Sequence, residues 1–87
     1  MRYQAKIDVY LKDGVSDPEG STIAEAARSL EIAPVIRIRS GKSFLVTFDL
    51  ASESETLNAA HKIGIELLSN PVIQDFEVSE ITEIASE

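Results

Sequence analysis

The sequence predicts an α+β domain in which helices cover one face of a single antiparallel sheet. Residues 3–11 alternate strictly between apolar and polar side chains, which is the period of a half-buried β-strand. Asp17-Pro18 and the pair Ser52 and Glu55 are helix-start signals, the first a cap followed by proline and the second a capping box. The chain has only 87 residues, so one domain spanning the whole chain is expected.

The first helix is expected to begin at Asp17, its N-cap, and to end near Glu31 to Ala33, before Pro34. Pro18 fits the first helical position, where no backbone N–H is needed. Gly20 is unusual in a first helical turn and indicates that another part of the molecule approaches the backbone there.

The remaining predicted elements are a strand over Val35–Ser40, a strand over Phe44–Leu50, a helix from Ser52 to about Ser69 and a strand over Val72–Ile81. Ser40-Gly41-Lys42 is interpreted as the tight turn of a hairpin, where glycine is favoured. Asn70-Pro71 is expected to end the second helix. The alternation of the last strand slips near Glu80, which a bulge, a bend or a separate docking segment would explain.

The predicted order is strand, helix, strand, strand, helix, strand. The short second-to-third connection favours an antiparallel hairpin, and each helix favours a right-handed crossover. The simplest arrangement is the ferredoxin-like βαββαβ fold, a four-stranded antiparallel sheet with both helices on one face. The first and third strands would then be central and the other two would be edges.

Composition excludes several classes of function. The net charge of −7 opposes binding to nucleic acids and to anionic lipid, so neither nucleic acid nor membrane is an expected partner. The chain has no cysteine and a single histidine, His61, which predicts no disulfide and no metal site. No apolar run reaches the roughly 18 residues of a membrane span, and Met1–Gln4 lacks a signal-peptide core. A cytosolic protein is expected.

Self-association is expected, because so short a chain has a thin core of its own. The sheet face away from the helices would mix apolar and charged residues, and the side chains predicted to pack against a copy are Tyr10, Arg37, Leu45 and Ile73. An ordinary solvated face is the alternative. Ile81 and Ile84 lie beyond the predicted sheet and are expected either to anchor a neighbouring chain or to belong to a frayed terminus.

The chain shows no pattern for chemistry of its own. His61 falls in the middle of the second predicted helix, next to a core position, and is interpreted as a boundary residue rather than a base. Arg37, Arg39 and Lys42 form a basic cluster that could hold a phosphate or a partner's carboxylate, or could protect an edge strand from aggregation. The residues therefore predict a binding or assembly module.

Three blocks of the sequence resemble the PurS family, in its order and spacing. They are the strand end and helix start Leu11–Gly20, the hairpin Ile38–Lys42 and the block Leu67–Glu77, which contains Asn-Pro-Val-Ile. PurS is the small subunit of phosphoribosylformylglycinamidine (FGAM) synthase, a glutamine-dependent, ATP-consuming C–N ligase of de novo purine biosynthesis.

The resemblance implies a non-catalytic subunit that forms a homodimer or a dimer of dimers. It would bridge a glutaminase subunit and a large ligase subunit and would assist the passage of ammonia between them. ATP and Mg²⁺ would bind the ligase, and this chain would hold no cofactor. The matched loops would contact the partners through Asp17, Pro18, Gly20, Arg39, Gly41, Lys42, Asn70 and Pro71, although caps and turns would also explain these residues.

A second hypothesis stays open from the sequence alone. The same fold could serve as a stand-alone regulatory domain that binds a small ligand, such as an amino acid, at the loop between Asp13 and Gly20.

Overall fold

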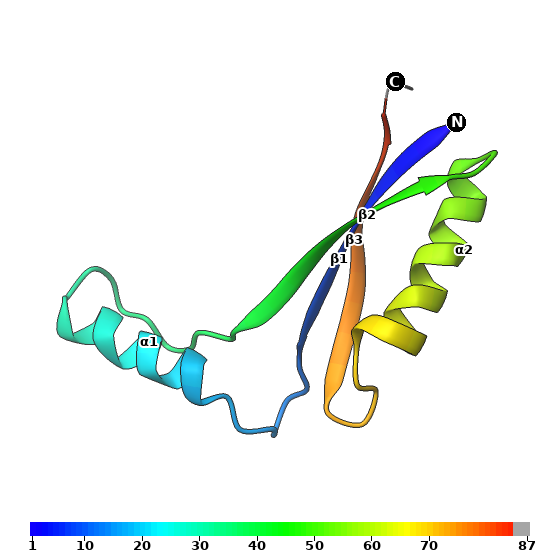
Figure 1. Ribbon diagram of the computed structural model, residues 1–87. Helices are drawn as coiled ribbons and strands as arrows, with labels where there is room; N and C mark the ends of the chain where they lie inside the picture. The colour runs from blue at the N-terminus through cyan, green and yellow to red at the C-terminus, as the bar shows by residue number, and fades with distance from the viewer. Residues whose placement is uncertain (85–87) are drawn as a thin grey trace.

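The computed structural model describes residues 1–84, which form one sheet and three helical segments (Figure 1). In chain order the elements are strand β1 (Arg2–Leu11), helix α1 (Pro18–Ser29), strand β2 (Gly41–Asp49), helix α2 (Glu53–Ile63), the π-helical turn η1 (Gly64–Leu68) and strand β3 (Gln74–Ile84). None of the helices in this part of the chain is long and apolar enough to cross a membrane.

The sheet has the order β2-β1-β3, and both pairs of strands are antiparallel. Strand β1 is central, so its alternate residues are buried from Tyr3 to Val9, as the sequence pattern predicts. Helix α2 lies over β1 and β3 and closes a small core around Ala5, Ile7 and Ala60. The packed part of the molecule therefore has two layers, a three-stranded sheet and the helix α2 on one of its faces.

The predicted four-stranded sheet is wrong, because the sheet of the described chain has three strands. Val35–Ser40 forms no strand, and Ser40-Gly41-Lys42 is not a hairpin turn. Gly41 is instead the first residue of β2, and the chain enters β2 directly from the preceding segment. Alternating side chains indicate that a segment can form a strand with one buried face. They do not specify which strand it pairs with, or whether it pairs at all.

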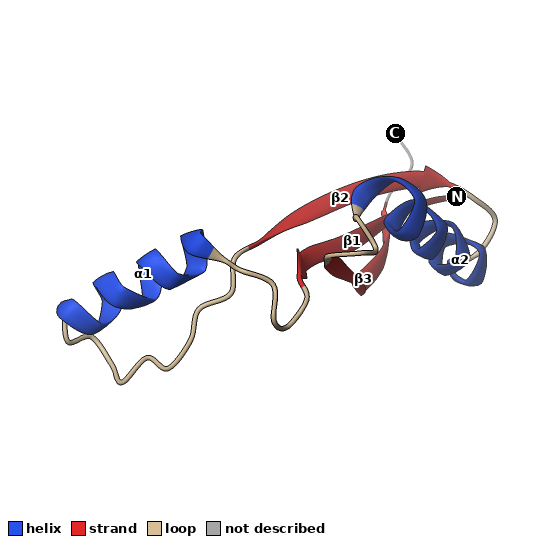
Figure 2. Ribbon diagram, turned by 90° about the horizontal axis from the view of Figure 1, so that it is seen from below, coloured by secondary structure: helices blue, strands red, loops and turns tan. Residues whose placement is uncertain are grey.

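The prediction of two helices on one face is also wrong. Helix α1 lies beyond one end of the sheet and does not cover it, whereas α2 packs on the sheet (Figure 2). The radius of gyration is 16.4 Å, whereas a compact chain of this length has a value of about 12 Å. The crossover that would bring α1 back over the sheet does not form within one chain.

The predicted helix starts are confirmed. Asp17 caps α1 with Pro18 in the first position, and Ser52 caps α2 by accepting a hydrogen bond from the Glu55 amide at 3.1 Å. In the usual capping box the glutamate side chain accepts from the amide of the N-cap residue. Here Oε2 of Glu55 accepts instead from the amide of Ala51, the residue before the N-cap, at 3.1 Å.

The slip in the last strand is a register shift. Lys6 pairs with Glu80 and Ile7 pairs with Val78, which leaves Ser79 as an extra residue in β3. Strand β3 continues to Ile84, so Ile81 and Ile84 lie inside the sheet. The expectation that they lie beyond it is wrong. Ile81 packs against the chain's own core.

Gly64 lets α2 lie close to β3 because it has no side chain. A Cβ atom at this position would be 2.5 Å from Cδ2 of Phe76. Gly64 is also the first residue of η1, so the helix widens at the point where it passes over the Phe76 ring.

We predict that Gly64→Ala lowers the free energy of unfolding by about 1–3 kcal/mol, because the added methyl group overpacks the site. In an unhindered helix the same change would be stabilising by about 0.5–1 kcal/mol. Urea unfolding followed by circular dichroism measures the difference, with the exposed α2 substitution Ser54→Ala as the control. A variant as stable as the original chain would contradict this packing.

Candidate functional site

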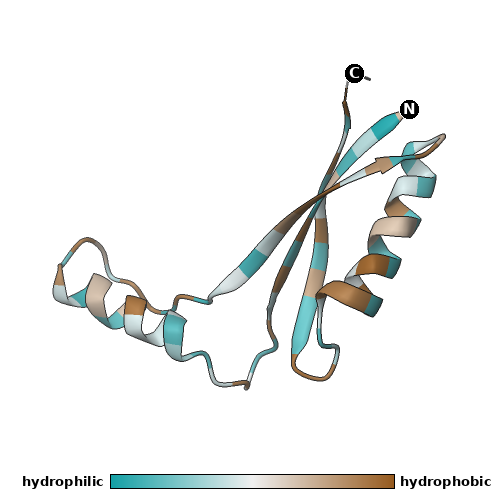
Figure 3. Cartoon of the chain, viewed as in Figure 1, coloured by the Kyte–Doolittle hydropathy of each residue, from teal (hydrophilic) through white to brown (hydrophobic). Residues whose placement is uncertain are grey.

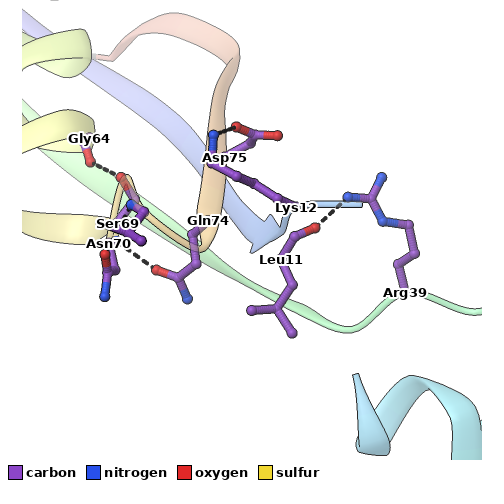
Figure 4. Close-up of polar contacts among 9 residues, drawn as sticks. Leu11, Lys12, Arg39, Gly64, Ser69, Asn70, Gln74 and Asp75 are labelled. Carbon is purple, nitrogen blue, oxygen red and sulfur yellow. Dashed lines mark hydrogen bonds and ion pairs between the residues drawn. The ribbon is translucent and has the colours of Figure 1, made fainter. Parts of the chain in front are cut away.

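Three segments that are far apart in the sequence meet where β1 ends (Figure 4). The backbone N–H of Lys12 donates to the carbonyl oxygen of Ile73 at 2.9 Å, and Nη2 of Arg39 donates to the carbonyl oxygen of Leu11 at 2.6 Å. We call this region the β1 end, and it consists of Leu11–Gly20, Ile38–Lys42 and Leu67–Glu77. All eight residues predicted to contact partners belong to it.

Asp17 joins two of these segments. Its carboxylate accepts hydrogen bonds from the Gly20 amide at 3.0 Å, the Ser40 amide at 2.7 Å and the Ser40 hydroxyl at 2.5 Å. The Ser40 hydroxyl, the Ser40 amide and the Gly20 amide together lower the pKa of Asp17 below its ordinary value. The carboxylate that a ligand at the Asp13–Gly20 loop would meet is thus already engaged.

Gly20 shows the close approach that its position indicated. A Cβ atom there would clash with the carbonyl oxygen of Ile38 and with the Asp17 carboxylate. The first turn of α1 therefore lies directly against the segment that leads into β2, and Asp17 fixes that contact.

Arg39 connects the β1 end to the uncovered face of the sheet. Its guanidinium carbon lies 4.6 Å from the centre of the Tyr10 ring, which is a cation–π contact. An open surface cavity of about 420 Å³ lies beside it, and the charged side chains around this cavity are Asp8, Arg39, Lys42 and Glu77. Charges of both signs in an open cavity suit a protein surface better than a small ligand, which normally needs an enclosed apolar site.

The turn before β3 is held by its own polar groups. The Asn70 side-chain oxygen accepts from the Val72 amide at 3.1 Å, and the Gln74 side-chain oxygen accepts from the Asn70 amide at 2.7 Å. This ordered turn nevertheless presents apolar side chains to solvent, with Val72 80% exposed and nearby Leu67 77% exposed. Ordered, exposed apolar residues of this kind mark contact surfaces.

Among residues 1–84 no three His, Cys, Asp or Glu side chains gather as metal ligands would. His61 packs edge-on against the Phe76 ring, with 5.7 Å between ring centres, which gives the histidine a packing role.

The residues predicted for self-association do not form one group. Tyr10 and Leu45 lie on the uncovered face of the sheet, where Leu45 is 64% exposed. Arg37 bonds Asp13 at 3.1 Å beside α1, and Ile73 lies in the turn before β3. Ile81 and Ile84 belong to β3.

Sequence reasoning missed Ser40 and the apolar side chains around α1. The Asp17–Ser40 bonds join residues 23 positions apart, so no local pattern could reveal them. The exposed apolar residues of this region are Ile23, Leu30, Ile32 and Ile36.

Comparison with known proteins identifies the family. The sequence profile of PurS, described as phosphoribosylformylglycinamidine (FGAM) synthase, matches residues 4–82. The chain belongs to the PurS family. Among curated relatives, FGAM synthase subunit PurS of Thermotoga maritima is 33% identical over 79 residues, which cover 91% of this chain and 96% of the relative. PurS of Archaeoglobus fulgidus is 36% identical over 73 residues, which cover 82% and 91%.

Solved PurS structures have the same fold. Thermus thermophilus PurS superposes with a TM-score of 0.89 at 30% identity, covering 98% of this chain and 100% of the other. A chain of a structure described as PurLQS from Thermotoga maritima superposes with a TM-score of 0.80 at 30% identity, covering 97% and 99%. The three-stranded architecture is therefore shared with the family.

We predict that Asp17→Asn frees the Ser40 amide, because an uncharged amide is a weaker acceptor for three donors. The folded-state pKa of Asp17 lies below its unfolded value, so its contribution is complete above about pH 4 and is lost as the pH falls through the folded pKa. Amide hydrogen exchange at Ser40 and Gly20 measures this: the two chains should differ most near neutral pH and converge in acid.

The matched control is Asp13→Asn, because the only side-chain bond of the Asp13 carboxylate within residues 1–84 is the one it accepts from the exposed Arg37. Asp13→Asn should leave exchange at Ser40 unchanged. Equal protection of Ser40 in the Asp17→Asn chain and the original would contradict the assigned role of Asp17.

Proposed function

We propose that this chain is the non-catalytic assembly subunit of an FGAM synthase. It joins a glutaminase subunit to an ATP-dependent ligase subunit in the cytosol, in a step of purine biosynthesis. The observation that supports this most strongly is the match along nearly the whole chain to a chain of the Thermotoga maritima PurLQS structure, which is an assembly. The chain's own residues offer surfaces for contact, which suits the same role.

The chemistry explains why such a subunit matters. Ammonia released from glutamine is a nucleophile only while it is unprotonated, and bulk water would protonate and dilute it. A subunit that seals the seam between two enzymes keeps water out and so preserves the ammonia for the ligase. ATP and Mg²⁺ act in the ligase subunit, and this chain contributes shape and surface.

The β1 end is the surface proposed to contact the other subunits. Pro18, Lys42 and Pro71 are exposed and available for contact, whereas Asp17 and Gly20 hold the backbone behind them. Arg39 does both, since it bonds Leu11 and also lines the open cavity. Gly41 and Asn70 shape the two segments that carry these side chains. The partner surface is expected to be apolar opposite Val72 and acidic opposite Lys42.

The uncovered face of the sheet is proposed to pack on a copy of the chain, giving a homodimer or a dimer of dimers. Leu45 and Tyr10 supply apolar area on this face, between charged residues of both signs. Such a mixture is typical of interfaces between soluble subunits.

We predict that the chain is required for glutamine-dependent synthesis and not for ammonia-dependent synthesis. In the test, the glutaminase and ligase subunits of the same organism are pre-incubated with ADP-Mg²⁺, with or without this chain. The synthesis rate is then measured with either glutamine or free ammonium as the nitrogen source. An equal glutamine-dependent rate in its absence would refute the proposal.

Lys42→Glu refines this test, with Lys62→Glu on the exposed surface of α2 as its matched control. Only the first is expected to lower the glutamine-dependent rate several-fold at limiting subunit concentration, and neither should change the ammonia-dependent rate.

We predict that Leu45→Asp lowers the mass of the assembly measured by sedimentation equilibrium, because it places a charge in the proposed face-to-face contact. Leu45 is 64% exposed, so the chain itself should still fold. Ser54→Asp on α2 is the control. An unchanged mass for Leu45→Asp would show that this face is simply solvated.

A further inference from the structure

An exposed apolar surface lies where η1 leads into the turn before β3. Figure 3 shows hydrophobic ribbon at the end of the helix and again in that turn. Ile65 is 56% exposed, and Leu67 and Val72 are more exposed still. We call this region the η1 surface, and it consists of Ile65, Glu66, Leu67, Pro71 and Val72. Large apolar side chains gathered in this way mark a contact surface.

The η1 surface is held in place by hydrogen bonds. The Ser69 amide and hydroxyl both donate to the Gly64 carbonyl oxygen, at 3.0 and 2.7 Å, which closes η1. The amides of Ile73 and Gln74 both donate to the Asn70 carbonyl oxygen, at 3.1 and 2.7 Å, which closes the turn. A partner that binds here meets a preformed surface, so little conformational entropy is lost on binding.

A cavity of about 230 Å³ lies between η1 and the turn, and its apolar walls are Ile65, Pro71 and the Phe76 ring. It is smaller than the pockets of roughly 300–1,000 Å³ that hold small ligands. A cavity of this kind suits a single side chain of a protein partner, and such buried anchors carry much of the energy of a protein–protein contact.

The charge around the η1 surface is negative. From Ile63 to Glu87 the sequence has six acids and no lysine or arginine. Glu66 is exposed, and none of the ion pairs within residues 1–84 includes it. Of the described residues that line the cavity, only Lys12 is basic, and its ammonium group is paired with Asp75 at 3.1 Å. A partner that covers this surface therefore needs lysine or arginine around its apolar contact.

A basic surface, consisting of Arg39 and Lys42, lies on the other side of β1. Arg39 lies over the Tyr10 ring, on the uncovered face of the sheet. The turn η1 packs on the opposite face with α2, against β1 and β3. In Figure 4, Arg39 and Asn70 accordingly lie on opposite sides of Lys12. Two surfaces of opposite charge thus flank the end of one strand.

We propose that the η1 surface and the basic surface bind different subunits of the synthase. The η1 surface takes the subunit whose facing patch is apolar and rimmed by lysine or arginine. This rests on the bridging role proposed above, and it specifies how the chain distinguishes its two partners. Like charges reject the wrong subunit at each surface, so one enzyme does not occupy both positions.

A second copy of the chain does not suit the η1 surface. A twofold contact would place Glu66 of one copy near Glu66 of the other, in a chain whose net charge is already −7. A contact between the η1 surface of one copy and the basic surface of another would be head-to-tail, and such contacts continue into open filaments unless the rotation closes. A different protein with a basic patch avoids both difficulties.

Cross-linking within the full assembly tests the assignment. The chain has no cysteine, so Leu67→Cys and Lys42→Cys each place a single thiol on one of the two surfaces, at exposed positions. Each variant would be labelled with benzophenone maleimide, combined with the glutaminase and ligase subunits, glutamine and ADP-Mg²⁺, and irradiated. We expect position 67 to cross-link one enzyme and position 42 the other. Ser54→Cys on the exposed surface of α2 is the control for non-specific labelling.

Cross-linking of both positions to the same enzyme would overturn the proposal. A product at position 67 that contains only this chain, or no product there in an active assembly, would overturn it as well. The proposed function is judged separately, because it stands as long as glutamine-dependent synthesis requires the chain.

Charge reversal tests the basic character of the partner patch. Glu66→Lys should raise several-fold the chain concentration that gives half of the maximal glutamine-dependent rate, and the difference should shrink as salt is added. Glu83→Lys makes the same change of charge near the far end of β3 and is the matched control. Equal effects of the two variants would overturn the assigned chemistry of the partner.

Discussion

The Asp17 carboxylate ties the first turn of α1 to Ser40, and the rest of the architecture depends on that tie. Three donors converge on this group from two segments, so the base of α1 and the entry to β2 move as one piece. Because β2 is fixed to β1 by its ladder, α1 is directed away from the sheet. The single chain is left with one covering helix and a core centred on Ala5, Ile7 and Ala60.

A core of this size is small for a free-standing domain. Conformational entropy opposes folding along the whole chain, and burial must outweigh it. Here several large apolar side chains remain exposed, from Leu30 directly after α1 to Leu67 and Val72 at the β1 end. These residues lie in separate segments of the chain, which suits a subunit with more than one contact surface.

Local features of the fold could be predicted from the sequence, and non-local ones could not. The alternation of β1, the Asp17-Pro18 start and the Ser52 cap depend on neighbouring residues, and all are confirmed. The segment Ser40-Gly41-Lys42 is different, because the same residues fit a hairpin turn and a direct entry into β2. In the structure the Ser40 amide donates to the Asp17 carboxylate, 23 residues away, and no local pattern reveals that contact. For the site, the sequence blocks indicated three candidate segments, but only the structure shows that they meet at one end of β1.

The central claim is that the folded chain depends on contacts with another copy, and the dependence of its stability on concentration tests this most directly. The midpoint of urea unfolding would be measured over a hundredfold range of chain concentration. A chain stabilised by association has a midpoint that rises with concentration. A midpoint independent of concentration, with a folded species of one chain's mass, would contradict the account.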